Sequence, residues 1–271
     1  MSEFWDRYVE VQIGSKIFSL EDYDIEFEIE NSDSEEAGLA EIAVWNLGES
    51  KDVFKVDEFV QLKAGYKNDY GVIFLGKIDK VVQERNKADI KTVAKCSDFT
   101  KELFRKKIYK VYSEGTSIKA IVSDLLAEAG IPVGKIEDPG INIEKKTVFG
   151  GKTNSTIFNV ISEEILPLVN GEGKQFKFYV GTDGLGYFVK EDYRGNEVIV
   201  LDSESGLIEV RDKSDEEEQK YAVRCLLNWK IKQDMIVKID SFVVSGNFKV
   251  SRLKHVCRSE DYYTELEVIP L

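Results

Sequence analysis

The sequence predicts a mainly β protein with an α+β insert: two antiparallel β-barrel domains and a small α/β domain between them. Three observations predict this class. Apolar and polar residues alternate through about the first hundred positions and again near the C-terminus. Apolar residues take a helical spacing only between these regions, starting at Thr116. The two alternating regions also share a pattern of strands and turns.

Composition narrows the class of protein. The chain has 271 residues, with 37 Lys+Arg against 50 Asp+Glu and a net charge of −13. The 42% hydrophobic content is enough for a packed core. An acidic chain is a poor ligand for nucleic-acid phosphates, so we expect no specific nucleic-acid binding. No apolar run approaches the ~20 residues of a membrane span, so we expect no membrane insertion. The N-terminus lacks a signal-peptide pattern, which predicts assembly in a cytoplasm.

Cysteine and histidine content argues against metal sites and several kinds of catalysis. Cys96, Cys225 and Cys257 form no CxxC pair, and His255 is the single histidine. A structural zinc site needs four such ligands close together. We therefore expect three reduced, buried thiols, no metal, no cofactor and no catalytic residues. His255 lies in a strand-like stretch, RLKHVCR, which does not resemble a nucleophile turn.

The first region, residues 1–112, is interpreted as a series of strands. Its alternating segments are Val9–Ile13, Tyr23–Glu30, Ala40–Leu47, Phe59–Gly65, Val72–Val82 and Ile90–Cys96. The composition of Asn31–Gly38 is typical of a loop. This spacing of short strands is typical of a meander or small barrel.

The middle region, residues 113–195, is predicted to hold two helices and a hairpin. The first helix is capped by Thr116 or Ser117 and ends before Gly130 and Pro132. The second runs from Ser155 to about Leu166, with Pro167 near its end. We expect the two helices to pack through Ile121, Leu125, Phe158 and Ile161. A hairpin then joins Phe176–Val180 to Tyr187–Lys190.

The last region, residues 196–271, returns to strands. They are expected at Val223–Ile231, Met235–Val244, Phe248–Val256 and Tyr262–Ile269, after a charged loop at Asp212–Lys220. Its final three strands repeat the layout of Phe59–Cys96: a short strand, a long strand, and a last strand opened by an acid three residues before Thr. That acid and Thr are Asp89 and Thr92 in the first region, and Asp261 and Thr264 in the last. We interpret this as a duplicated domain.

The chain resembles a known family on four stretches. They are Ala43–Leu47, Val60–Tyr66, Gly71–Ile78, and Gly246 through His255. These stretches are similar to the late-control-protein-D-like baseplate hub proteins of long-tailed and contractile phages. The middle helices match in pattern only, and the motifs are structural.

The resemblance implies a structural protein, not an enzyme. In that family each chain carries two tail-tube-like barrels, and three chains form a pseudo-sixfold ring between the tail tube and a central spike. It implies a homotrimer whose partners are tail tube, spike, tape measure and baseplate wedge proteins. The product is a virion or a phage-tail-like particle assembled in the bacterial cytoplasm. The sequence does not separate a phage from a phage-like bacteriocin or a contractile injection system.

The candidate functional residues are acidic. From Ile17 to Ser50 there are eleven acids and no Lys or Arg. Asp24, Glu26, Glu28 and Glu30 fall on one side of one strand. We expect a face of uniform negative sign that lines the lumen of the ring; an ordinary solvated strand face is the alternative.

Two other functions remain open. One is a tail-associated cell-wall hydrolase that uses paired carboxylates, such as Glu163 and Glu164 on the second helix. The other is a carbohydrate-binding or partner-binding module, in which Tyr179, Tyr187 and Tyr193 would be exposed. The same residues also suit a solvated helix face and ordinary strands.

Overall fold

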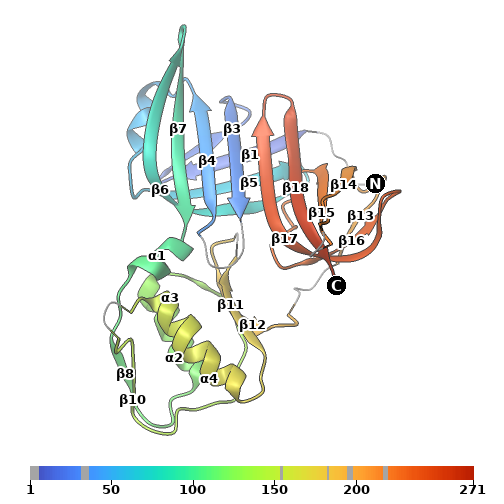
Figure 1. Ribbon diagram of the computed structural model, residues 1–271. Helices are drawn as coiled ribbons and strands as arrows, with labels where there is room; N and C mark the ends of the chain where they lie inside the picture. Colours follow the sequence, from blue (N-terminus) through green and yellow to red (C-terminus); the bar gives the residue numbers. More distant parts are fainter. Residues whose placement is uncertain (1–5, 32–36, 153–154, 182, 194–197, 216–218) are drawn as a thin grey trace. The chain divides into compact units, whose positions relative to one another are not determined.

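The computed structural model describes residues 6–31, 37–152, 155–181, 183–193, 198–215 and 219–271. Contacts divide the chain into two compact units, Met1–Asp98 with Arg194–Leu271, and Phe99–Tyr193. The first is a β unit, and the second combines helices with short strands (Figure 1). By contacts the middle unit starts at Phe99, since Leu103 and Ile108 pack in its core. The division at 1–112, 113–195 and 196–271 stays a prediction.

One hydrogen-bonded sheet of 13 strands makes up the β unit. Its order is β14-β15-β18-β17-β3-β4-β7-β6-β5-β1-β2, with β16 paired to β17 and β13 paired to β16. The strands of the first region are β1 (Arg7–Ile13), β2 (Lys16–Ser19), β3 (Ile25–Asn31), β4 (Leu39–Trp45), β5 (Phe59–Tyr66), β6 (Asp69–Asn86) and β7 (Asp89–Asp98). Those of the last region are β13 (Ile199–Leu201), β14 (Leu207–Asp212), β15 (Tyr221–Leu226), β16 (Ile236–Asp240), β17 (Ser245–Arg258) and β18 (Asp261–Pro270). The predicted mainly β, antiparallel character is confirmed, while closure into two barrels stays a prediction.

The two β regions follow the same strand order. In the first, the neighbours run β3-β4-β7-β6-β5-β1, and in the last they run β14-β15-β18-β17-β16-β13. Each strand except β2 therefore has an equivalent at the same place in the strand order of the other region. One pairing differs in direction, because β13 lies parallel to β16 whereas β1 lies antiparallel to β5.

The register of the β6–β7 pair also agrees with that of the β17–β18 pair. In β6, three residue pairs with β7 precede a bulge between Ile78 and Lys80. In β17, three pairs with β18 precede a bulge between Val250 and Arg252. A bulge inserts one unpaired residue and increases the local twist, so both long strands turn at the same step. Both hairpins also close with two residues between their last paired positions, which are Asn86 with Asp89, and Arg258 with Asp261.

Equivalent side chains make equivalent contacts. Counting from the bulges makes Thr92 the equivalent of Thr264, and Gln83 the equivalent of His255. Gln83 Nε2 lies 3.4 Å from Thr92 Oγ1, and His255 Nδ1 lies 2.9 Å from Thr264 Oγ1. The alignment of Asp89 and Thr92 with Asp261 and Thr264 made from the sequence therefore holds in the sheet register.

Strand β17 joins the two regions. One of its edges pairs with β18 from Phe248 to Arg258. The other edge is divided between β16 (Ser245–Lys249) and β3 (Leu253–Cys257). The junction is reinforced by Arg7, which donates to the carbonyls of Ser259 and Glu260 at 2.9 and 2.7 Å. The first region thus gains its last neighbour from a strand more than two hundred residues later.

Alternation explains the cores. In β3, Ile25, Phe27 and Ile29 are buried on one side and contribute to the core of the first region. The last region has its own core, which includes Val237, Val250 and Leu266. Each fully buried apolar side chain of this size contributes about 1.5–3 kcal/mol relative to exposure. A one-residue slip would turn either set of side chains to water, so burial fixes the register.

The middle unit packs helices against a small sheet. Its helical elements are α1 (Thr100–Arg105), α2 (Ile118–Ala129), α3 (Ile157–Asn159), a π-helical segment (Val160–Ile165) and α4 (Leu166–Gly171). Its strands are β8 (Lys110–Tyr112), β9 (Val133–Ile136), β10 (Thr147–Phe149), β11 (Phe176–Val180) and β12 (Gly186–Lys190). The β11–β12 hairpin is confirmed as antiparallel, and β9 lies parallel to β12.

Helix α2 begins and ends as its sequence predicts. The Ser117 side chain accepts a hydrogen bond from Ala120 N, and Gly130 takes a left-handed conformation at φ 74°. Ile121 and Leu125 are fully buried in the core of the unit, together with Ile161. Phe158 is only partly buried and lies against Phe104, with ring centroids 4.3 Å apart. Phe158 also packs against this core, so all four expected residues contribute to it, three of them fully buried.

The second helix does not end near Pro167. It starts after the cap residue Thr156 and continues through Pro167 to Gly171. A proline normally breaks a helix, because its ring clashes with the carbonyl four residues earlier. Here the preceding segment is π-helical, and Leu166 N donates to Ile161 O, five residues earlier. This wider turn separates the proline ring from the preceding backbone and lets the helix continue.

Candidate functional site

The candidate site is the polar side of β3. Strand alternation that buries Ile25, Phe27 and Ile29 places Glu26, Glu28 and Glu30 together on the opposite side, where each is half-buried. Asp24 lies just before β3 and is exposed. The expected common face is therefore present for the three glutamates.

Two strands supply a cation to each glutamate: β17, which pairs with β3, and β7, which lies on the far side of β4. Lys91 Nζ on β7 lies 2.6 Å from Glu26 Oε2. Lys254 Nζ on β17 lies 2.6 Å from Glu28 Oε1, and Arg258 donates to Oε2 of the same residue. Arg252 Nε lies 3.3 Å from Glu30 Oε1. The polar side of the sheet is thus a lattice of cross-strand ion pairs, in which β3 receives cations from two basic strands.

The expectation of a face of uniform sign is wrong. It was based on one stretch of sequence, and the compensating cations come from strands that approach β3 only after folding. The hydrogen bond from Lys254 lowers the pKa of Glu28 despite the opposing effect of burial, so this carboxylate is ionised at neutral pH. The position of this face on the lumen of a ring stays a prediction.

A shallow groove of about 520 Å³ follows the same face. Its charged lining consists of five acids and three cations: Glu26, Glu28, Glu30, Glu41 and Asp79, with Lys91, Lys95 and Arg258. Glu41 Oε2 on β4 lies 3.1 Å from Lys95 Nζ on β7. Alternating charges that neutralise one another in this way give a hydrated surface with little net attraction for either a polyanion or a polycation.

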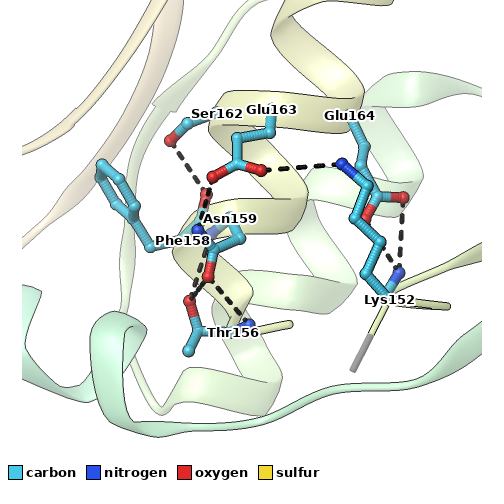
Figure 2. A network of polar contacts seen from close by, with 8 residues as sticks. Lys152, Thr156, Phe158, Asn159, Ser162, Glu163 and Glu164 are labelled. Carbon is cyan, nitrogen blue, oxygen red and sulfur yellow. Dashed lines mark hydrogen bonds and ion pairs between the residues drawn. The ribbon is translucent and has the colours of Figure 1, made fainter. Parts of the chain in front are cut away.

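The carboxylate pair proposed for hydrolysis does not converge on one point. Figure 2 shows that Glu163 and Glu164, which are both on the second helix, point to different partners. Glu163 Oε1 accepts from Asn159 Nδ2 at 2.7 Å, and Glu163 Oε2 lies 3.8 Å from Lys152 Nζ. Glu164 accepts from Gly150 N at 3.3 Å. These contacts tie the helix to the preceding loop, which is a structural role.

The tyrosines of the proposed binding module lie in and after the β11–β12 hairpin. Tyr179 and Tyr187 face each other across it, with ring centroids 5.0 Å apart and nearly parallel planes. Tyr187 donates to Asp183 Oδ2 at 2.8 Å. Lys135 lies over the ring of Tyr193 at 4.2 Å. The three rings thus stack on, or bond to, groups of their own unit.

Buried thiols and the histidine are placed as strand residues. Burial raises the pKa of Cys96, Cys225 and Cys257 to about 12, which leaves them protonated. His255 is 1% exposed, and burial lowers its pKa to about 3. Among the described residues no group of three or more His, Cys, Asp or Glu side chains could hold a metal ion. In the same residues no helix is both long and apolar enough to cross a membrane.

Two solved structures that share this fold are tail proteins. The 43 kDa tail protein of prophage MuSo2 from Shewanella oneidensis matches with a TM-score of 0.70 at 11% identity, over 98% of this chain and 97% of its own. A tail protein from Neisseria meningitidis MC58 matches with a TM-score of 0.66 at 11% identity, over 98% and 97%. The resemblance to phage tail proteins is therefore confirmed at the level of fold.

A third structure comes from a secretion system. The c3393 protein of E. coli, described as a component of the type VI secretion system with structural similarity to the T4 bacteriophage tail proteins gp27 and gp5, matches with a TM-score of 0.64. It is 9% identical, over 96% of this chain and 76% of its own. Comparison with models of known protein families gives no match. Comparison with curated protein sequences gives none either.

The sequence interpretation missed the cations of the site. Lys91 and Lys95 are four residues apart on β7, and Arg252, Lys254 and Arg258 are an even number of residues apart on β17. Even spacing places each set on one side of its strand, so the alternation of both strands held the signal. What the sequence did not give was adjacency, because β3 and β17 are separated by most of the chain.

Proposed function

We propose that this chain is a structural baseplate hub protein, three copies of which form a pseudo-sixfold ring between a tail tube and a central spike. The observation that carries the proposal is the repeated strand order, with bulges and hairpins in equivalent register, in two regions of one sheet. Two similar regions per chain let three chains present six similar positions, which suits a partner with sixfold symmetry.

Fold likeness supports a role in a tail. Nearly the whole chain aligns with nearly the whole of two tail proteins, and another neighbour belongs to a secretion system. The partners we propose are a tail tube protein on one face and a spike protein on the other, with tape measure and wedge proteins around them. The ring acts by fitting its neighbours and needs no catalytic group.

We further propose that Asp24, Glu26, Glu28 and Glu30, with the cation partners of the glutamates, lie on the channel side of the ring. The ion-pair lattice supports this, because paired charges keep a surface wet without holding passing cargo. The cause of poor adhesion is therefore charge balance across strands, which replaces the repulsion expected from a row of acids.

Light scattering and electron microscopy test the proposed ring. Three chains carry 3 × −13 = −39 charges, so mutual repulsion opposes assembly at low salt and salt screens it. Light scattering from 20 mM to 500 mM salt is expected to show mass rising toward three chains. Electron micrographs are expected to show a ring with a central hole, and a map shows whether β3 faces that hole.

Two results would contradict the proposal. One is a twofold dimer at every salt concentration, since such an interface cannot build a threefold ring. The other is clearing of a cell-wall suspension by the purified chain, which would support the hydrolase alternative; the matched control is Glu163→Gln with Glu164→Gln. A ring whose map places β3 on its outer wall would contradict the channel assignment alone.

A further inference from the structure

In the part of the chain that the structure describes, β2 and β13 pair on one side only, and two further strand edges without a strand neighbour lie on β6 and β14. Along β6, pairing with β5 ends at Lys77, although the strand continues to Asn86. Figure 1 shows the β6–β7 hairpin extending past β3 and β4. At the other end of the sheet, β14 pairs with β15 on one side only. An unpaired strand edge presents free backbone donors and acceptors to another strand.

The chain itself shows what such an edge pairs with. The segment of β17 equivalent to Val81–Arg85 is Leu253–Cys257, and it pairs antiparallel with β3. The equivalent of β3 is β14, because both are the outer neighbours of equivalent strands. Inside one chain, the edge of β3 in the first region therefore pairs with the edge of β17 in the last region. The unpaired edge of β6 is the equivalent of the β17 edge, and that of β14 is the equivalent of the β3 edge. The two unpaired edges therefore match the paired ones with the two regions exchanged.

Burial at equivalent positions shows that the β6 edge lacks a cover. Leu253 is 2% exposed and His255 is 1% exposed, with β3 alongside. Their equivalents Val81 and Gln83 are half-buried and exposed. A groove of about 490 Å³ lies beside Val81 and Gln83, and its lining also includes Asp52, Phe54 and Lys55 of the same chain. The last region has its covering strand, and the first does not.

We propose that residues 210–214 of one copy, which are the end of β14 and the two residues after it, pair antiparallel with Val81–Arg85 of β6 of the next copy. The contact rests on the proposed ring and gives it an interface. Transferring the β17–β3 register through the equivalences places Glu84 opposite Arg211 and Gln83 opposite Asp212. Opposed charge at the first pair and an amide facing a carboxylate at the second favour this register. Arg211 is exposed and pairs with Glu209, two residues away on its own strand.

This contact is directional, which has a consequence for assembly. Each chain offers one β6 edge and one β14 edge, so contacts run head to tail and do not pair two chains symmetrically. Each contact between chains relates two β regions by the same rotation as the β17–β3 junction does inside the chain. A ring of three chains then contains three internal and three external junctions of one type.

The test is a disulfide across the predicted register. The double variant Glu84→Cys, Arg211→Cys places two thiols at directly opposed positions, where cross-strand geometry allows a bond. The three native thiols are buried with raised pKa and do not compete. Mild oxidation at 500 mM salt is expected to give covalent trimers on a non-reducing gel. The matched control, Glu84→Cys with Asp212→Cys, moves one thiol to the other side of its strand and is expected to give no cross-link.

A second arm uses charge. Glu84→Arg alone and Arg211→Glu alone are each expected to weaken association about fivefold, and the two together are expected to restore it. Both positions are exposed, so the folded chain is expected to unfold at the same denaturant concentration in all variants.

The outcomes separate this contact from the ring itself. Trimers by mass that neither cross-link in this register nor respond to the charge exchange would overturn the contact and leave the hub proposal standing. An open ladder of cross-linked chains, with no closed trimer, would support the contact and contradict the ring. Chains that stay monomeric and uncross-linked at high salt and millimolar concentration would overturn both.

Discussion

At the scale of single residues, the position of a side chain in the two-region sheet determines how deeply it is buried. His255 and Gln83 occupy equivalent positions, each bonded to a threonine on the next strand. Only His255 is covered by β3, and burial lowers its pKa from 6.5 to about 3. The single histidine of the chain is therefore a neutral core residue, which agrees with its strand-like sequence context.

His255 makes stability depend on pH. Between pH 6.5 and about 3 the unfolded chain binds a proton at this residue that the folded chain does not bind, so the free energy of unfolding falls as pH falls. The fully developed slope is about 1.4 kcal/mol per pH unit. Urea unfolding from pH 7.5 to 4.5 is expected to show this loss in the natural chain. The variant His255→Gln, which copies the residue of the first region, is expected to lose most of it.

Gln83→His is the matched control, since it places a histidine at the equivalent but exposed position, where little pH dependence is expected. Carboxylates such as Glu28, whose pKa is lowered from 4.5, lose their contribution to stability mainly below pH 4.5, which is under the range of the titration. Equal slopes for the natural chain and His255→Gln would show that the histidine is not the source.

At the scale of helices and strands, the sequence was informative wherever one periodicity ran uninterrupted. The alternation around Phe27 and the stripe through Leu125 both predicted real elements, because burial of one face is a local property of the sequence. Pro167 was misinterpreted as a helix end, because the compensating π-helical turn depends on packing of the whole unit. The short strands β9 and β13 were not predicted, since three or four residues carry too little periodicity.

The candidate site was predictable only in part for the same reason. One strand's alternation placed Glu26, Glu28 and Glu30 on a common side, and this was found from the sequence. Their partners Lys91 and Lys254 belong to strands that come close to β3 only through tertiary pairing, which no local pattern encodes. The sign of the face was therefore misjudged, although the face itself was correct.

The core of α2 gives a quantitative test. Leu125 is fully buried in the core of the middle unit, so Leu125→Ala removes buried methyl groups and leaves a cavity. We expect a loss of about 2–5 kcal/mol in the free energy of unfolding of that unit, measured by denaturant titration. Lys119→Ala, on the exposed side of the same helix, is expected to change it by less than about 0.5 kcal/mol. Similar values for the two variants would mean that the stripe does not face the core.

At the scale of the whole molecule, the first β region is completed by the last strands of the chain. The β3 edge is covered by Leu253–Cys257, and Arg7 is held by the turn at Ser259 and Glu260. A chain that ends at residue 244 lacks β17 and β18 and leaves that edge open. We expect its residues 6–98 to be cut by a nonspecific protease much faster than in the full chain.

Limited proteolysis with identification of the first fragments measures this. A chain ending at residue 270 is the control, because it lacks only the exposed Leu271. If residues 6–98 resist cleavage equally in both chains, the first region is stable without its distant neighbour.

The order of synthesis determines when β3 and β17 can pair. At about 5–20 residues per second, more than 220 residues separate the emergence of β3 from that of its partner, so the edge stays uncovered for roughly 10–45 s on the ribosome. An open strand edge can pair with another chain, and nascent copies on the same message carry the same edges. Glu28 and Glu30 receive their cations only when Arg252 and Lys254 are made. Until then the unneutralised acids of β3 repel the same strand of a neighbouring nascent chain, so the residues that later bind the two regions together first keep separate chains apart.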